Sequence, residues 1–259
     1  MMKITVLTEN TACREDLAAE HGLSLFCETA DAVFLFDMGQ TDLFARNADV
    51  LGIDLARAEF AVLSHGHYDH GGGMAEFFRR NDRAPVYLTD RAFEAHYNGT
   101  EKYIGLDPSL RENPRLIFTG DAHTIRPGFT LATNNDAPRP DSFGSFGLTK
   151  KSGSALVPDD FLHEQYLLVE EAGKRILLSG CSHKGILDIM RWYHPDVLIG
   201  GFHFSKLEDE GILAEAACRL NEFDTDYYTC HCTGASQAAF LGKRMPRLHT
   251  VSCGDTITI

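Results

Sequence analysis

The sequence predicts a mixed α/β protein (α+β in its arrangement), a four-layer αββα sandwich in which two β-sheets lie between outer helices. Short runs of apolar and β-branched residues recur in both halves of the chain, and helical patterns follow several of them. No linker, biased tract or internal repeat interrupts the 259 residues. We therefore expect one domain that covers residues 1–259.

The first half is dominated by strand patterns whose continuous apolar runs indicate burial on both faces. Helices are expected at 40–51, where Leu43, Phe44, Ala48 and Leu51 share one face, and at 74–80, directly after three glycines. The expected strands are 4–9, 23–28, 32–37, 60–64, 85–89 and 115–120.

The second half opens with three strand patterns and continues with alternating helices and strands. Residues 134–160 are rich in Asn, Asp, Pro, Gly and Ser, so we expect a long surface loop, and loops of that length are often functional. The expected strands are 129–133, 166–171, 175–180, 196–202, 226–230 and 256–259, and the expected helices are 184–193, 207–223 and 234–243.

Composition excludes several classes of partner. The net charge of -13, from 37 acidic against 24 basic residues, disfavours binding to nucleic acid or to an anionic membrane, although it leaves room for a local basic pocket. No segment approaches the roughly 20 apolar residues that span a bilayer. Seven scattered cysteines are typical of reduced thiols, so we expect a soluble cytoplasmic protein.

One motif carries chemistry. His65, His67, Asp69 and His70 form H-x-H-x-D-H between an apolar run and three glycines. Residues two apart at a strand end point the same way, so His65 and His67 can converge, while Asp69 and His70 can aim at a second point. Imidazole and carboxylate suit zinc, iron or manganese, and the spacing allows two ions about 3.5 to 4 Å apart. A loop of solvated histidines is the alternative, which four ligand-type residues at this spacing disfavour.

Further ligands must come from other strand ends. The candidates beside predicted strands are His163, Cys181, His183, His203 and His231. We expect solvated side chains for His96, His194 and His249 and small buried thiols for Cys230 and Cys232, whereas His123 is left undecided.

These residues resemble a known family. LSHGHYDHGGG (63–73) resembles the signature of the metallo-β-lactamase superfamily, and FDMGQ (36–40) resembles its strand that carries a buried aspartate. The order of EHGLS, DDFLHEQ, SGCSHKGI, GGFH and HCTG is similar to one branch. That branch contains the archaeal 7,8-dihydropterin-6-methyl-4-(β-D-ribofuranosyl)-aminobenzene-5'-phosphate synthase.

The resemblance implies a metal site at one edge of the sandwich, where loops from both sheets meet. It implies that His65 and His67 bind a first metal, that Asp69 and His70 bind a second, and that Asp37 orients a ligand. His163 and His183 compete as third ligand of the first metal. Cys181 stands where most relatives bridge the metals with an aspartate. His231 is preferred over His203 as the last ligand, which makes His203 a candidate for contacting substrate or acting as acid or base.

The first functional hypothesis is a hydrolase. One or two divalent ions, zinc above iron or manganese, would supply hydroxide at neutral pH for attack on an ester, lactone or phosphoester of a small molecule, with Asp69 helping to orient it.

Three alternatives stay open. A synthase-like transferase would join a pterin diphosphate to an arylamine, and it would need a basic pocket, for which Lys150, Lys151 and Lys184 are candidates. The other two are an iron-dependent redox enzyme and a metal-binding protein without turnover.

Overall fold

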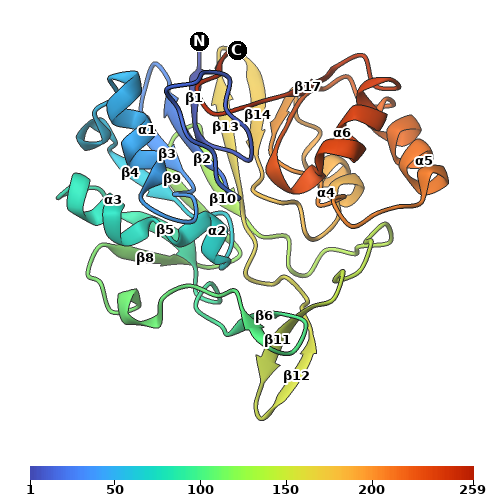
Figure 1. The fold of residues 1–259 in the computed structure, drawn as a ribbon, viewed down its shortest axis with the longest axis horizontal. Coiled ribbons are helices and arrows are strands. Elements are labelled where there is room, and N and C mark those ends of the chain that lie inside the picture. Colours follow the sequence, from blue (N-terminus) through green and yellow to red (C-terminus); the bar gives the residue numbers. More distant parts are fainter.

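The computed structural model describes residues 1–259 and contains two seven-stranded sheets packed face to face, as Figure 1 shows. The αββα prediction is confirmed. In spatial order the first sheet contains β18 (Thr256–Thr258), β1 (Lys3–Thr8), β2 (Ser24–Glu28), β3 (Val33–Phe36), β4 (Phe60–Val62), β5 (Val86–Thr89) and β8 (Leu116–Thr119). The second contains β17 (Leu248–Thr250), β16 (Asp226–Thr229), β15 (Val197–Ile199), β14 (Lys174–Leu178), β13 (Tyr166–Glu171), β10 (Phe129–Ala132) and β9 (Ala122–Arg126).

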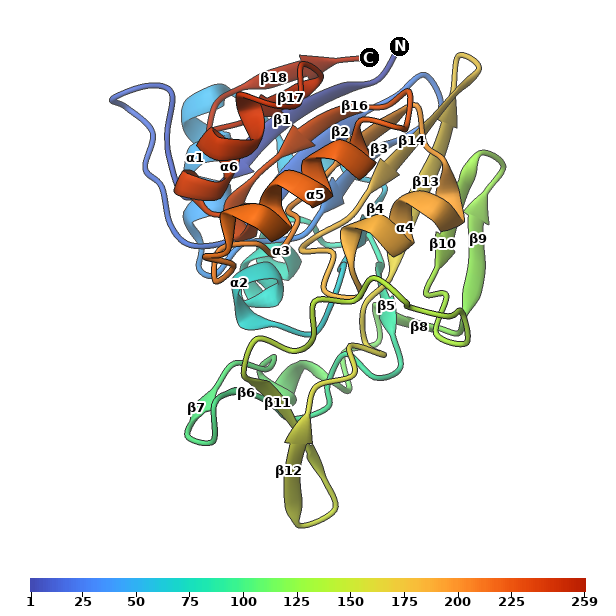
Figure 2. The ribbon, with the colours of Figure 1, turned by 90° about the vertical axis from the view of Figure 1, so that its right-hand side faces the viewer.

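Helices cover the outer face of each sheet (Figures 1 and 2). The first sheet is covered by α1 (Leu43–Leu51) and α3 (Met74–Arg80), and the second by α4 (Ile186–Tyr193), α5 (Glu210–Leu220) and α6 (Ala235–Gly242). Short helical turns are α2 (Tyr68–Gly71), η1 (Leu55–Arg57), η2 (Pro108–Leu110) and η3 (His231–Thr233). No helix is both long enough and apolar enough to cross a membrane.

The apolar strand runs pack in two directions. In β3, Phe34 and Phe36 enter the core between the sheets, whereas Leu35 packs under α1 and α3. The ring of Phe34 stacks on Phe60 at 5.1 Å between centroids, and Phe129 of the second sheet meets Phe34 edge-on at 5.8 Å. Because the strands are buried on both faces, their sequences are continuous apolar segments.

Strand direction determines where the site forms. In the first sheet β3, β4, β5 and β8 run parallel, and in the second β14, β15, β16 and β17 do. The carboxyl ends of parallel strands meet at one edge of a sheet, and ligands gather in the loops that follow them.

The predicted loop at 134–160 is wrong over its second half. It contains β11 (Leu148–Ser152) and β12 (Ala155–Pro158), which form a four-stranded sheet with β6 (His96–Asn98) and β7 (Lys102–Tyr103). Figure 2 shows this sheet below the two large ones. The pairing of β11 with β6 joins residues about fifty positions apart, so no local pattern reports it. Strands β9 and β17 were also missed.

Candidate metal centre

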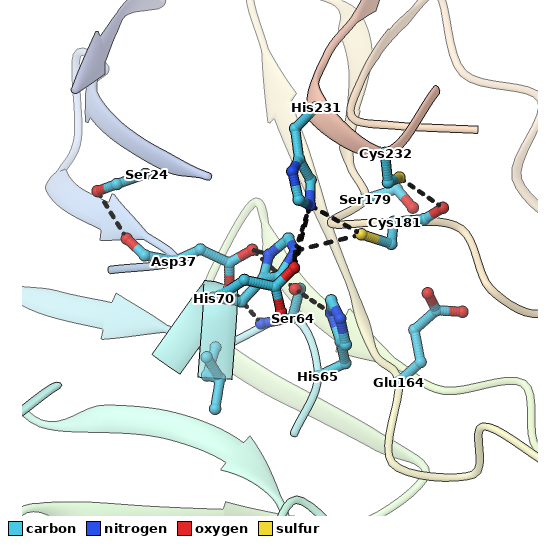
Figure 3. A network of polar contacts seen from close by, with 12 residues as sticks. Ser24, Asp37, Ser64, His65, His70, Glu164, Ser179, Cys181, His231 and Cys232 are labelled. Atoms are coloured by element: carbon cyan, nitrogen blue, oxygen red, sulfur yellow. Dashed lines mark hydrogen bonds and ion pairs between the residues drawn. The ribbon is translucent and has the colours of Figure 1, made fainter. Parts of the chain in front are cut away.

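Loops at the carboxyl ends of five strands meet between the two large sheets, and Figure 3 shows part of the side chains that they bring together, among them Asp37, His65, His70, Cys181 and His231. Asp37 follows β3 and the H-x-H-x-D-H motif follows β4. Cys181 and His183 follow β14, His203 follows β15, and His231 follows β16. His163 precedes β13 and approaches from the side of the small sheet.

Backbone strain concentrates in these loops. Nine residues other than glycine have positive φ, and five of them lie at the centre: Asp37 (59°), Phe161 (55°), Ser182 (58°), His203 (54°) and His231 (35°). Such conformations cost free energy and persist where the surroundings hold them, which is common at functional sites.

Four ligand-type residues form the first cluster, which we call the sulfur position. His70 Nε2 lies 3.0 Å from His231 Nε2 and 3.2 Å from Cys181 Sγ, and that sulfur lies 3.4 Å from His231 Nε2. Asp69 Oδ2 completes the cluster, 3.5 Å from His231 Nε2 and 3.9 Å from His70 Nε2. One ion with bonds of about 2.0 to 2.3 Å fits among atoms with this spacing.

The second cluster contains only imidazoles, and we call it the nitrogen position. His65, His67 and His183 each bring one ring nitrogen within 4.8 Å of the others, and His65 Nε2 lies 3.3 Å from His183 Nε2. His67 Nε2 is buried and has no hydrogen-bond partner. Between the two sequence candidates for third ligand, the structure brings His183 into this cluster.

Asp37 links the two positions through hydrogen bonds. Its Oδ2 lies 2.7 Å from His70 Nδ1 and accepts a hydrogen bond of 2.7 Å from Ser64 Oγ. Because the single hydroxyl proton of Ser64 goes to Asp37, Ser64 Oγ accepts from His65 Nδ1 at 2.8 Å. Both histidines therefore carry their protons on Nδ1 and direct Nε2 lone pairs at the two positions.

His231 is held in the same tautomer from the opposite side. Its Nδ1 lies 3.3 Å from Asn10 Oδ1, and its backbone N–H donates to Glu9 Oε1 at 2.7 Å. The Nε2 lone pairs of His70 and His231 consequently face each other across 3.0 Å. Two lone pairs at that distance repel unless a proton or a metal cation lies between them, and with the Cys181 sulfur and the Asp69 carboxylate close by the residues fit a bound metal cation.

The electrostatics of the centre support the same fit. Burial, reinforced by the neighbouring imidazoles, holds the pKa of His65, His183 and His231 well below the usual histidine value, so these rings are neutral ligands. Burial also lowers the pKa of His70, but Asp37 and Asp69 outweigh it and raise that pKa to about 9. The site thus attracts positive charge. Burial raises the pKa of the Cys181 thiol, so its thiolate requires a cation nearby.

One side of the centre is open. The side chain of Asp69 is 13% exposed, and its Oδ2 lies 3.3 Å from Nε2 of His21, whose side chain is 58% exposed. His203 is half-buried, its ring lies 4.1 Å from that of His183, and its Nδ1 has no partner. Asp69 and His21 are thus partly exposed, and the half-buried His203 ring lies beside the nitrogen position.

A separate buried group lies beside the nitrogen position. His96 Nδ1 lies 2.8 Å from Asp159 Oδ2, which is 3.5 Å from His163 Nε2, and all three side chains are fully buried. The expectation that His96 is solvated is wrong, because the small sheet covers it. Burial lowers the pKa of His163 to about 4. Together with His67, these residues place one nitrogen or oxygen atom each within 4.8 Å of the others.

The lysines expected to bind phosphate are engaged elsewhere. Lys184 is fully buried, and its Nζ donates to the carbonyls of Thr133 and Glu164 at 2.6 and 2.7 Å. Lys150 pairs with Asp160 at 2.8 Å and with Glu94 at 3.4 Å. Lys151 is exposed.

Besides Ser64 and Asn10, sequence reasoning missed four residues that support the centre. Glu164 accepts the backbone N–H groups of His183 and Lys184, Glu9 accepts that of His231, and His21 and Asp159 contact ligand-type side chains. His21, Asp159 and Glu164 lie within EHGLS and DDFLHEQ, so the motifs that carried the resemblance contained the signal. The other solvated assignments, His194 and His249, are confirmed.

The αββα sandwich and the histidines clustered in its loops define a class of metal-binding proteins. The chain belongs to the metallo-beta-lactamase superfamily, whose family model matches residues 19–181. That superfamily binds divalent metals, in agreement with the two clusters.

Relatives cover nearly the whole chain. The uncharacterized protein MJ0448 of Methanocaldococcus jannaschii is 28% identical over 89% of this chain and 90% of its own length. The 7,8-dihydropterin-6-methyl-4-(beta-D-ribofuranosyl)-aminobenzene-5'-phosphate synthase of the same organism is 25% identical, covering 90% and 88%. Among solved structures, Tm1679, described as a metal-dependent hydrolase of the beta-lactamase superfamily, has a TM-score of 0.87 at 26% identity and covers 100% of this chain and 99% of its own.

Proposed function

We propose that this protein is a metal-dependent hydrolase that cleaves an ester, lactone or phosphoester of a small molecule. Two divalent cations would be held, one at the nitrogen position and one at the sulfur position. The observation that carries the proposal is the 3.0 Å approach of His70 Nε2 and His231 Nε2, both fixed as lone-pair acceptors. A thiolate ligand at Cys181 favours zinc over manganese.

Bound cations supply the main chemical power, because they lower the pKa of a coordinated water from 15.7 towards about 7 and polarise a carbonyl or phosphoryl oxygen. Residues beside the cations would orient the attacking water and transfer protons. Asp69, held by His21 at 3.3 Å, would orient the attacking water. His203, a half-buried ring 4.1 Å from that of His183, would exchange a proton with the leaving-group oxygen.

Two aromatic rings lie next to the centre, where an organic substrate would bind. The ring of Phe146 lies 5.4 Å from His203, and the ring of Phe161 stacks on His183 at 4.6 Å. Because Phe161 is buried, an apolar part of the substrate could contact the half-buried ring of Phe146 while its ester or phosphoester group reaches the cations. The seven free cysteines support a reducing compartment, the cytoplasm, as the place of action.

The similarity to the archaeal synthase supports a second candidate, a transferase that joins a pterin diphosphate to an arylamine. Such a reaction needs cationic groups for two phosphates. The engagement of Lys184 and Lys150 within the fold makes this candidate weaker than hydrolysis.

The test is a substrate panel with controlled metal content. Zinc-loaded protein is mixed with esters, lactones and phosphoesters, and separately with a pterin diphosphate and an arylamine. We expect hydrolysis in the first panel, its loss after chelation, and its return with zinc. The matched control is His123→Ala, which removes a histidine of β9 outside the centre and should leave turnover unchanged. Hydrolysis that survives complete chelation would contradict the proposal, and a joined pterin product would favour the transferase.

A further inference from the structure

The group formed by His96, Asp159 and His163 has no role in the proposed reaction, yet its three side chains are fully buried and joined through one carboxylate. Asp159 Oδ2 lies 2.8 Å from His96 Nδ1 and 3.5 Å from His163 Nε2, and its Oδ1 accepts the backbone N–H of Phe161 at 2.8 Å. Burying such a carboxylate is unfavourable unless it is hydrogen-bonded and paired with cationic or polar groups. Asp159 is hydrogen-bonded to the His96 ring, and Nε2 of the His163 ring lies next to the same oxygen.

The hydrogen bonds of His163 decide which nitrogen carries its proton. Its Nδ1 accepts the backbone N–H of Gly66 at 2.9 Å. A neutral ring that accepts at Nδ1 carries its proton on Nε2, where it faces Asp159. This is the reverse of His70, whose Nδ1 faces a carboxylate and whose Nε2 is free. His163 consequently offers no free lone pair to a cation.

The peptide that His163 contacts lies between two ligand-type residues. Gly66 separates His65 from His67, and a Cβ at this glycine would lie 2.1 Å from the carbonyl oxygen of Ala92. The segment is thus held between Ala92 on one side and the His163 ring on the other. A displacement of this peptide would change the angle between the two neighbouring imidazoles.

We infer that His163 is a positioning residue, which fixes the Gly66 peptide so that His65 and His67 converge, and that Asp159 and His96 hold it in the accepting tautomer. The inference rests on the proposed two-cation function. It also replaces the alternative in which His163 is the third ligand, because His183 lies with His65 and His67 in the nitrogen position.

Two variants at one residue separate positioning from ligation. In His163→Asn the amide oxygen can occupy the place of Nδ1 and accept the Gly66 N–H, whereas no atom reaches the place of Nε2. In His163→Ala both are lost. Cobalt(II) equivalents are counted by elemental analysis, affinities are measured by competition with a chelator, and thermal melting checks folding. His123→Ala serves as the off-site control.

A positioning role predicts that His163→Asn binds two equivalents with affinities near those of the wild type. His163→Ala should bind the ion of the nitrogen position about 10 to 100-fold more weakly, the usual effect of removing a group that orients a ligand. The cobalt–thiolate absorption, which reports Cys181, should not change in either variant. Should His163→Ala fail to fold, Asp159→Asn provides the second route, with weakening at the nitrogen position alone.

Three results would contradict the positioning role of His163. If His163→Asn and His163→Ala both bind one equivalent fewer than the wild type, His163 is a ligand and the inference is wrong, although the proposed function stands. A folded Asp159→Asn variant with both affinities unchanged would also contradict it. A wild-type protein that binds no cation would overturn the proposed function and the inference together.

Discussion

The sulfur position and the nitrogen position lie side by side but differ in chemistry. The former combines two imidazoles with the Cys181 sulfur and the Asp69 carboxylate, whereas the latter has three imidazoles and no anionic ligand. Anionic ligands attract a divalent ion more strongly than neutral ones, and sulfur favours a thiophilic ion. We therefore expect tight, zinc-selective binding at the sulfur position and weaker, less selective binding at the nitrogen position.

The two positions also differ in how they are supported. Asp37 contacts His70 directly at 2.7 Å but reaches His65 only through the hydroxyl of Ser64. The remaining support comes from different parts of the chain, Asn10 for His231 and Glu164 for the loop that carries His183. One buried carboxylate thus sets the proton of one ligand in each position, and independent contacts complete each.

The largest expected effect comes from removing one imidazole from each position. His70→Ala should lose the ion of the sulfur position and with it the cobalt–thiolate absorption, because it removes a ring whose nitrogen lies 3.2 Å from Cys181 Sγ. His65→Ala should lose the other ion and retain that absorption. Both should abolish turnover. Identical spectra for the two variants would show that the positions do not bind separately.

A smaller effect is expected when the shared support is weakened. Asp37→Asn should lower affinity at both positions by about 10 to 100-fold, because the carboxylate no longer fixes the ligand protons. Ser64→Ala breaks only the connection to His65, so it should weaken the nitrogen position alone. Chelator competition with each variant measures the two affinities. Equal weakening at both positions in Ser64→Ala would contradict the division of support.

Much of the fold was readable from local pattern. The strands of both large sheets form apolar runs, because each strand packs on two layers. The helices that connect them along the chain have one apolar face, which packs on the outer side of a sheet. The small sheet was not readable. Its strands are two to five residues long and mostly not buried, and β11 pairs with β6 across about fifty residues, so the stabilising contacts are not local.

The centre could be predicted only in part for a related reason. The H-x-H-x-D-H motif is contiguous, so spacing alone indicates two convergent points. The choice between His163 and His183 depends on which ring nitrogen carries a proton, and Gly66 and Asp159 determine that through contacts from distant loops. The local sequence around His96 indicated a solvated side chain. The residues that cover it, 148–158, lie about fifty positions further along the chain, so the local sequence does not report them.

The smallest expected effect concerns the identity of the ion at the sulfur position. Cys181→Asp replaces a soft thiolate by a hard carboxylate of the same charge. The charge of the ligand set is kept, so two ions should still bind and turnover should persist within about tenfold, whereas zinc should lose part of its advantage over manganese. Competition between the two metals at fixed protein concentration measures that advantage.

Cys230→Ser is the matched control, because Cys230 lies in the core between the sheets. An unchanged preference in Cys181→Asp would mean that imidazoles, and not the sulfur, set metal selectivity, and the contrast between the two positions would then be one of charge alone.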